Sequence, residues 1–283
     1  MNIGAHVSAA GGVDQSPQRA NEIGCECFQI FSRSPRGGAA PELTKEIIEN
    51  FKAEMKKYQL TNFFIHTPYF INFASSKERV QFGSREVVRQ ELERGSKLGA
   101  KYVMTHLGAS KDVGHDVAIK MTIEGLKKLL QGYKGSTELL IEMSAGTGSI
   151  IGSDFDDIAE IFKKVKHSKL TGICFDTAHM FESGYDFRTK TALNNTLKEF
   201  DKKIGIDKLK LLHVNDSKTK LGSKIDRHAN IGEGELGIGA FEAIIADKRF
   251  KDIDFILETP GEENKVKDVI ILKKIRDKKY ATK

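Results

Sequence analysis

The fold is decided by the stretch ELLIEMSAGTGSIIGSDFDDIAEIFKKVKHSKLTGICFD, residues 138–176. Its two ends, ELLIE (138–142) and LTGICFD (170–176), are short apolar runs of the kind that form buried strands. Between them, DDIAEIFKKVK (156–166) has apolar residues every three or four positions, which is typical of a helix packed on a sheet. Strand, helix and strand in this order predict a βαβ unit with parallel strands.

The same alternation continues along the whole chain in both directions. The strand candidates are NIGAHV (2–7), CFQIF (27–31), NFFIH (62–66), YVMTH (102–106), ELLIE (138–142), LTGICFD (170–176), LKLLHV (209–214) and DFILE (254–258). The helix candidates between them include KEIIENFKAEMKKY (45–58), SREVVRQELERGSKLG (84–99), IKMTIEGLKKLLQGY (119–133), DDIAEIFKKVK (156–166) and FEAIIADKRF (241–250). Eight such repeats predict an α/β protein with one (β/α)8 TIM-barrel domain over residues 1–283, because a doubly wound open sheet usually has about six strands.

Composition narrows the class of protein. The chain has 39% hydrophobic and 30% charged residues, and its apolar runs are too short for a membrane span. The N-terminus does not have the layout of a secretion signal, so we expect a cytoplasmic protein without a membrane partner. The three cysteines lack the paired C-x-x-C spacing of a thiolate metal site and are expected to be buried. A net charge of +6 suits a polyanionic partner, although much of it comes from lysines on amphipathic segments.

Six strand candidates end in or near a residue type that binds metal ions. These residues are His66, His106, Glu142, Asp176, His213 and Glu258, at intervals of 34 to 45 residues. In a barrel of this kind the C-terminal ends of the strands meet at one mouth, where the active site lies. Imidazole and carboxylate side chains gathered there would be costly without a compensating charge. The pattern therefore predicts a multi-metal active site for Zn²⁺ or similar divalent ions.

Three more residues extend this set. Asp176 is followed by His179, three residues further on, and the later segment DRH contains Asp226 and His228. Together these residues could hold another ion in a more exposed position. His6 is a candidate for supporting the ligands, whereas His115 and His167 have no such neighbours and are expected to be surface histidines.

Four segments carry a resemblance to a known family. They are GAHVSAAGG (4–12), GICFDTAH (172–179), HVNDSKTKLGSKIDRHANIGEGELG (213–237) and LET (257–259). On these segments the sequence resembles the endonuclease IV family of DNA-repair enzymes, over nearly the whole chain. The third segment is long and highly specific, so it carries most of the weight.

The resemblance implies three Zn²⁺ ions, with Mn²⁺ or Fe²⁺ as possible substitutes. It places His66 and His106 on the first ion, Asp176, His213 and Glu258 on the second, with Glu142 bridging the two, and His179, Asp226 and His228 on the third. The implied reaction is hydrolysis of the phosphodiester on the 5′ side of an abasic site in double-stranded DNA, leaving a 3′-hydroxyl and a 5′-deoxyribose phosphate, with cleaning of 3′ ends as a further activity. Glu142 and Glu258 are the catalytic candidates, the first through the ions and the second through the nucleophile.

The resemblance also implies contacts with DNA. Tyr69 and Phe70 match wedge residues, Arg36 matches a residue that enters the base stack, and Ser217, Lys218 and Arg227 are candidate phosphate contacts. Three features depart from the family. Met143 stands where Asn is usual, the loop SRSPRGGAA (32–40) lacks an aromatic residue, and LGAS (107–110) replaces a Pro-Gly turn.

Two other functions compete with this interpretation. A sugar isomerase or epimerase would explain Glu142, Asp176, His213 and Glu258, but it would not explain His179 or the Asp226-x-His228 pair. A DNA-binding module that has lost catalysis would explain Met143, yet all nine ligand positions are filled. We therefore expect a metal-dependent hydrolase, acting as a monomer.

Overall fold

The eight apolar runs form the eight strands of a closed barrel. The structure is a computed structural model and describes residues 1–111 and 113–281. The barrel strands are β1 (Ile3–His6), β2 (Cys27–Ile30), β3 (Asn62–His66), β4 (Tyr102–Thr105), β5 (Glu138–Glu142), β6 (Leu170–Asp176), β7 (Leu209–His213) and β10 (Asp254–Leu257). All neighbouring pairs are parallel, and the barrel closes by pairing β1 with both β2 and β10. The predicted single-domain TIM barrel is confirmed.

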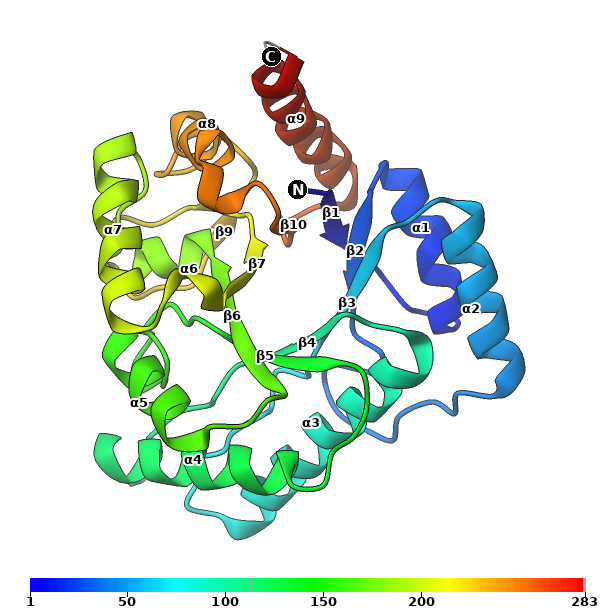
Figure 1. Ribbon diagram of the computed structural model, residues 1–283, viewed down its shortest axis with the longest axis vertical. Helices are drawn as coiled ribbons and strands as arrows, with labels where there is room; N and C mark the ends of the chain where they lie inside the picture. Colours follow the sequence, from blue (N-terminus) through cyan, green and yellow to red (C-terminus); the bar gives the residue numbers. More distant parts are fainter. Residues whose placement is uncertain (112, 282–283) are drawn as a thin grey trace.

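Helices surround the barrel and follow every one of its strands (Figure 1). The α-helices are α1 (Ser16–Ile23), α2 (Lys45–Lys57), α3 (Glu78–Leu98), α4 (His115–Leu130), α5 (Phe155–Val165), α6 (Thr177–Glu182), α7 (Lys190–Lys203), α8 (Ile238–Ala246) and α9 (Glu262–Ala281). Short 3₁₀ helices are η1 (Val13–Gln15), η2 (Ile206–Lys208) and η3 (Lys248–Phe250). None of the helices in the described part of the chain has the length and hydropathy that a membrane crossing requires.

The predicted helix boundaries differ from the observed ones by several residues. Helix α3 begins at Glu78, before the predicted start at residue 84, and it continues through Gly83. The space around Gly83 is open, since a Cβ added there would have no neighbour within 4 Å. Helix α8 ends at Ala246 rather than at residue 250. Asp247 has φ −80° and ψ 126°, which ends the helix, and its side chain accepts a hydrogen bond from the Arg249 N–H of η3.

Two hydrophobic clusters lie on opposite faces of the sheet. The larger cluster fills the space between strands and helices, and it includes Phe28, Phe63 and Val103. The smaller one is made by residues that alternate with these along the strands: Cys27, Phe64, Tyr102, Met104, Leu140, Cys174, Leu211 and Ile256. Because successive strand residues point to opposite faces, this second cluster fills the barrel interior. Gly4 completes the interior of β1, where a Cβ would collide with the Cys27 carbonyl oxygen.

All three cysteines are buried and unpaired, as expected. Burial raises the pKa of the Cys25 and Cys174 thiols to about 12, so both remain protonated at neutral pH. They belong to the packing of the barrel rather than to a metal site.

The connection after β7 carries a small antiparallel sheet of its own. Its strands are β8 (Asp216–Ser217) and β9 (His228–Ala229). The Asp216 carboxylate accepts hydrogen bonds from the backbone N–H groups of Gly232, Gly234, Leu236 and Gly237. This buried carboxylate therefore folds the Gly-rich segment after β9 back onto the hairpin. The hairpin brings Asp226 and His228 to the barrel mouth.

Candidate active site

Eight side chains form a ring at the C-terminal ends of the strands. They are His6, Gln29, His66, His106, Glu142, Asp176, His213 and Glu258. In every strand but β1, the residue two positions earlier belongs to the interior cluster. Strand periodicity therefore directs each ring side chain into the mouth, directly above the packed interior. The six ligand positions predicted from strand ends are brought together.

Glu142 lies at the centre of this ring. Its Oε2 is 2.7 Å from His66 Nε2 and 3.5 Å from His106 Nε2, and its Oε1 is 2.9 Å from His213 Nδ1. The Glu142 side chain is fully buried. Its ligand atoms belong to two groups that could each hold a metal ion: one with His66 and His106, the other with Asp176, His213 and Glu258.

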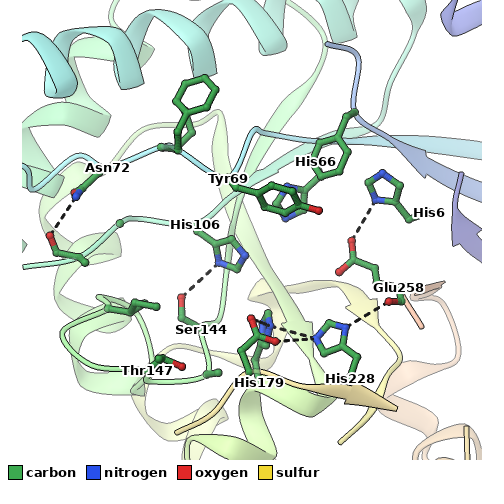
Figure 2. Close-up of a pocket in the computed structure, with 18 of the residues that line it drawn as sticks. His6, His66, Tyr69, Asn72, His106, Ser144, Thr147, His179, His228 and Glu258 are labelled. Atoms are coloured by element: carbon green, nitrogen blue, oxygen red, sulfur yellow. Dashed lines mark hydrogen bonds and ion pairs between the residues drawn. The ribbon is translucent and has the colours of Figure 1, made fainter. Parts of the chain in front are cut away.

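The third group lies on the side of the hairpin. His179 on α6, His228 on β9 and Asp176 place ligand atoms within 4.8 Å of one another. The sequence predicts Asp226 in place of Asp176. The Asp226 carboxylate oxygens lie 3.3 Å from His179 Nε2 and 3.5 Å from His228 Nε2, so this residue closes the exposed side of the group. Figure 2 shows His179 and His228 side by side, and their Nε2 atoms lie 3.4 Å apart.

Several histidines use one ring nitrogen for the protein and direct the other into the cluster. His66 Nδ1 donates to the Thr67 carbonyl oxygen at 2.6 Å, and His179 Nδ1 donates to the Met143 carbonyl oxygen at 3.0 Å. In each case the hydrogen bond assigns the proton to Nδ1 and leaves Nε2 facing the carboxylates. Metal-binding histidines are commonly oriented in this way.

Charge at the mouth is balanced by histidines alone. Within residues 1–111 and 113–281, every ion pair of Glu142, Asp176, Asp226 and Glu258 has a histidine as its partner. Burial by itself would raise the pKa of Glu142, but the adjacent imidazoles hold it well below its usual range. Burial would likewise lower the pKa of His213, and nearby acidic groups raise it well above the ordinary value. Such a cluster strongly favours bound positive charge, and its mixed nitrogen and oxygen donors fit divalent transition metals.

A cavity of about 670 Å³ opens above the cluster. Its floor includes His66, His106, His179, His228 and Glu258, and its wall is formed by the loops after β3, β4 and β5 (Figure 2). Two aromatic side chains line its rim and are exposed to solvent: Tyr69 is 70% and Phe70 is 42% exposed. Because both side chains are exposed, packing in the hydrophobic core does not explain why aromatic residues occupy this loop.

The other predicted DNA contacts have different surroundings. Arg36, Lys218 and Arg227 are exposed. Ser217 does not fit its predicted role, because it is fully buried and its hydroxyl donates to Glu182 Oε1 at 2.7 Å. Together with the N–H of Arg227, which donates to the same oxygen at 3.2 Å, this contact ties the hairpin to α6.

The departures from the family leave the ligands in place. The Met143 side chain is buried, and its backbone carbonyl orients His179 while Glu142 remains enclosed by histidines. In the loop after β2, the Arg33 guanidinium pairs with buried Glu91 at 2.7 Å.

Two amide side chains of the site are not predicted from the sequence. Gln29 completes the ring, and Asn215 donates to Asp176 Oδ2 at 2.6 Å while its Oδ1 accepts from the Glu258 N–H at 2.8 Å. A sequence signal exists for Gln29, because a polar residue two positions after buried Cys27 in a strand must face the same side. His6, His115 and His167 lie as expected: His6 contacts Glu258, and the other two are outside the mouth.

Comparisons with known proteins agree with the fold and identify the family. A family model of xylose isomerase-like TIM barrels matches residues 17–275. A probable endonuclease 4 from Nitrosopumilus maritimus is 42% identical, over 94% of this chain and 95% of the relative. Another from Halothermothrix orenii is 38% identical, over 98% of this chain and 99% of the relative.

Solved structures give the same result. The crystal structure of endonuclease IV from Thermus thermophilus has a TM-score of 0.87 and 30% identity, covering 98% of this chain and 100% of that one. A D-tagatose 3-epimerase-like protein has a TM-score of 0.73 at 20% identity and covers 100% of this chain and 99% of that one, which shows the shared fold alone. The chain therefore belongs to the endonuclease IV family of hydrolytic nucleases, within the xylose isomerase-like TIM barrels.

Proposed function

We propose that this protein repairs DNA by hydrolysing the phosphodiester on the 5′ side of abasic sites in the duplex, leaving a 3′-hydroxyl and a 5′-deoxyribose phosphate. The observation that carries the proposal is the convergence of three groups of metal-ligand atoms at the floor of one cavity, in a chain of the endonuclease IV family. The same chemistry on blocked 3′ ends is a further activity that we propose.

Nine residues would hold three Zn²⁺ ions, or Mn²⁺ or Fe²⁺ in their place. His66 and His106 would hold the first ion and Asp176, His213 and Glu258 the second, with Glu142 shared between them. His179, Asp226 and His228 would hold the third. The sharing of Glu142 between two groups supports this assignment, as do the distances of Asp226 from both histidines.

Glu142 and Glu258 have different proposed roles beside the ions. A divalent ion in such a site supplies positive charge to phosphate oxygens and lowers the pKa of water to about 7. Glu142 is fully buried, so its proposed role is to hold two ions at a fixed separation. The Glu258 side chain is 18% exposed and lines the cavity, so this carboxylate is placed to accept a hydrogen bond from the attacking water. Both roles would hold the nucleophile and the phosphate in one orientation.

Recognition of a missing base is proposed to involve Tyr69 and Phe70. Extruding a nucleotide costs a few kcal/mol of stacking, and apolar side chains that enter the gap offset that cost. Tyr69 is additionally supported from below by the Phe31 ring, at 5.1 Å between centroids. An exposed aromatic residue backed by another ring suits a wedge that must remain in place. Tyr69→Ala and Phe70→Ala are expected to weaken binding of abasic DNA and to leave the metal content unchanged.

Arg36, Lys218 and Arg227 are proposed to contact the DNA. Each phosphate contact that is lost should lower the slope of log affinity against log salt by about 1. Because all ligand and rim residues belong to a single chain, we propose that a monomer is the active unit.

The test is nicking of a labelled duplex that contains one abasic analogue, with the metal content measured on the same sample. We expect a single cut on the 5′ side of the analogue, a 3′-hydroxyl end and about three ions per chain. A duplex without the analogue serves as the specificity control, and Glu142→Gln controls for contaminating nuclease.

Two results would contradict the proposal. Equal cutting of the intact duplex would remove abasic specificity. Tight metal binding without cleavage of any DNA substrate would instead favour a binding role, with Met143 and the altered loop at residues 32–40 as the places to look.

A further inference from the structure

The Gln29 side chain occupies the ring position between β1 and β3, where it contacts two of the proposed metal ligands. Its Oε1 accepts a hydrogen bond from His213 Nε2 at 2.8 Å. Its Nε2 donates to Glu258 Oε1 at 2.6 Å and lies 2.9 Å from His6 Nδ1. Gln29 is fully buried, although it is not one of the nine proposed ligands.

The orientation of this amide follows from the chemistry of its neighbours. An ionised carboxylate can only accept hydrogen bonds, so the NH₂ group of Gln29 must face Glu258. The amide oxygen then faces His213, which must donate from Nε2. A flipped amide would place its oxygen against the carboxylate and its NH₂ against the Nε2–H, so both contacts would become repulsive.

This orientation determines which atoms of the two ligands face the centre. His213 Nδ1 lies 2.9 Å from Glu142 Oε1 and 3.3 Å from Glu258 Oε2, so a bound cation would replace the proton on Nδ1 and meet its lone pair, while Nε2 keeps its proton on Gln29 Oε1. Glu258 uses Oε1 for Gln29 and therefore directs Oε2 to the same space. Three acceptor atoms then surround one position, which is the environment that a divalent cation requires.

We propose that Gln29 is a positioning residue for the second metal ion: it fixes the tautomer of His213 and the rotamer of Glu258. Unlike His66 and His179, which are oriented by backbone carbonyl groups, His213 is oriented by a side chain that can be substituted. This inference rests on the proposed assignment of metal ligands. Partners of this type typically contribute 10- to 100-fold to metal affinity or activity.

The test compares metal retention in wild-type protein, Gln29→Met and Gln29→Glu. Methionine keeps the length of the side chain and removes both hydrogen bonds, so we expect one ion per chain to be lost to a chelator at about 10- to 100-fold lower chelator concentration. Glutamate keeps the acceptor for His213 but sets a second carboxylate against Glu258, which is a repulsive contact, so we expect Glu258 to be displaced and the ion to be lost at least as readily as in Gln29→Met. Gln18→Met, at an exposed glutamine on α1, is the matched control and should behave as wild type.

Two further readouts separate positioning from general stability. The visible absorption spectrum of the Co²⁺-loaded protein reports ligand geometry, and we expect it to change in both Gln29 variants and not in the control. With abasic duplex as substrate, kcat should fall while KM for the DNA stays within about two-fold, because the DNA contacts on the rim are intact. If Gln29→Met does not fold, the Gln29→Glu spectrum decides.

An unchanged Co²⁺ spectrum and unchanged chelator resistance in a folded Gln29 variant would overturn the inference alone. A wild-type protein that holds no ion would overturn the proposed function, and this inference with it.

Discussion

Acidic side chains at the two ends of the barrel have different kinds of charged partner. At the N-terminal end, Glu26 accepts hydrogen bonds from Arg276 Nη1 at 2.5 Å and Nη2 at 2.9 Å, and from the Ile3 N–H. Asp254 accepts from Asn2 and Asn62 in the same region. At the C-terminal mouth, the ion pairs of the described carboxylates involve histidines alone.

The difference shows which end balances its own charges and which end is suited to bind an added cation. Amide groups serve carboxylates at both ends, since Asn215 and Gln29 donate to Asp176 and Glu258 at the mouth. The charged partner is what differs: the Arg276 guanidinium keeps its charge at every pH at which the protein folds, so Glu26 is permanently paired. Imidazoles can give up their protons and bind a cation instead. The N-terminal end therefore stabilises the fold, whereas the mouth is built for an ion from outside. This division can be tested at both ends.

Removal of metal should have the largest effect and should be confined to the mouth. After dialysis against a chelator, nicking of abasic duplex is expected to fall to background and to return with Zn²⁺. If each ion had been present at about 100 times its dissociation constant, the loss of each one would cost about 2.7 kcal/mol, or roughly 5–10 °C in Tm. Far-UV circular dichroism should be unchanged, because the N-terminal network does not involve the ions. Full activity after verified metal removal would contradict the proposal that the mouth needs a bound ion.

The same substitution made at each end should separate catalysis from stability. Glu142→Gln is expected to slow nicking by about 100- to 1,000-fold, since it removes the charge shared by two ligand groups. Glu26→Gln should nick as wild type and lose about 1 kcal/mol of unfolding free energy, because it removes the charge of the two hydrogen bonds that Glu26 accepts from Arg276, while Arg276 keeps its contact with Asp277. Urea unfolding and nicking rates measured on both proteins check this. Slower nicking by Glu26→Gln at full metal content would link the two ends.

Much of this architecture could be predicted from the sequence, for a physical reason. Strand periodicity is local, so the position of a polar residue after an apolar run, as at His66 or Glu142, determines its direction. Helix boundaries follow less directly, because Gly83 is compatible with either a helix or a loop. Long-range partners such as Arg276 for Glu26, 250 residues apart, leave no local signal. For the same reason the contact between the Ser217 hydroxyl and Glu182 could not be predicted, since nothing nearby in the sequence indicates it.

The N-terminal ion pair should give stability a specific pH dependence. Burial would raise the pKa of Glu26, but Arg276 and the Ile3 N–H lower it below its ordinary value of 4.5. A group whose pKa is lower in the folded state stabilises above its unfolded pKa, and this contribution is lost as the pH falls through the folded value. Arg276→Met is therefore expected to cost about 1–2 kcal/mol at pH 7, and the cost should shrink below about pH 4.5. Urea unfolding from pH 7 to pH 4 measures it. In a Glu26→Gln background, Arg276→Met should show no such pH dependence, and a persistent one would assign the effect to another group.

The smallest expected effect is at Glu182. This carboxylate lies at the mouth, but like Glu26 it accepts hydrogen bonds from groups other than histidine. Its Oε1 accepts from the Ser217 hydroxyl and the Arg227 N–H, while its Oε2 is buried without a hydrogen-bond partner among the described residues. Burial raises its pKa, so its charge costs stability above the ordinary value of 4.5, and that cost falls as the pH drops. Glu182→Gln keeps the accepting oxygen and removes the charge, so we expect stability to rise by about 1 kcal/mol or less at pH 7, with metal content and nicking unchanged.

Glu182→Ala also removes the tie between the hairpin and α6, and should release the ion held by His228 and Asp226. If Glu182→Gln lost that ion as well, the negative charge of Glu182 would belong to the metal centre, and the division between satisfied and ion-binding carboxylates would have to be redrawn within the mouth.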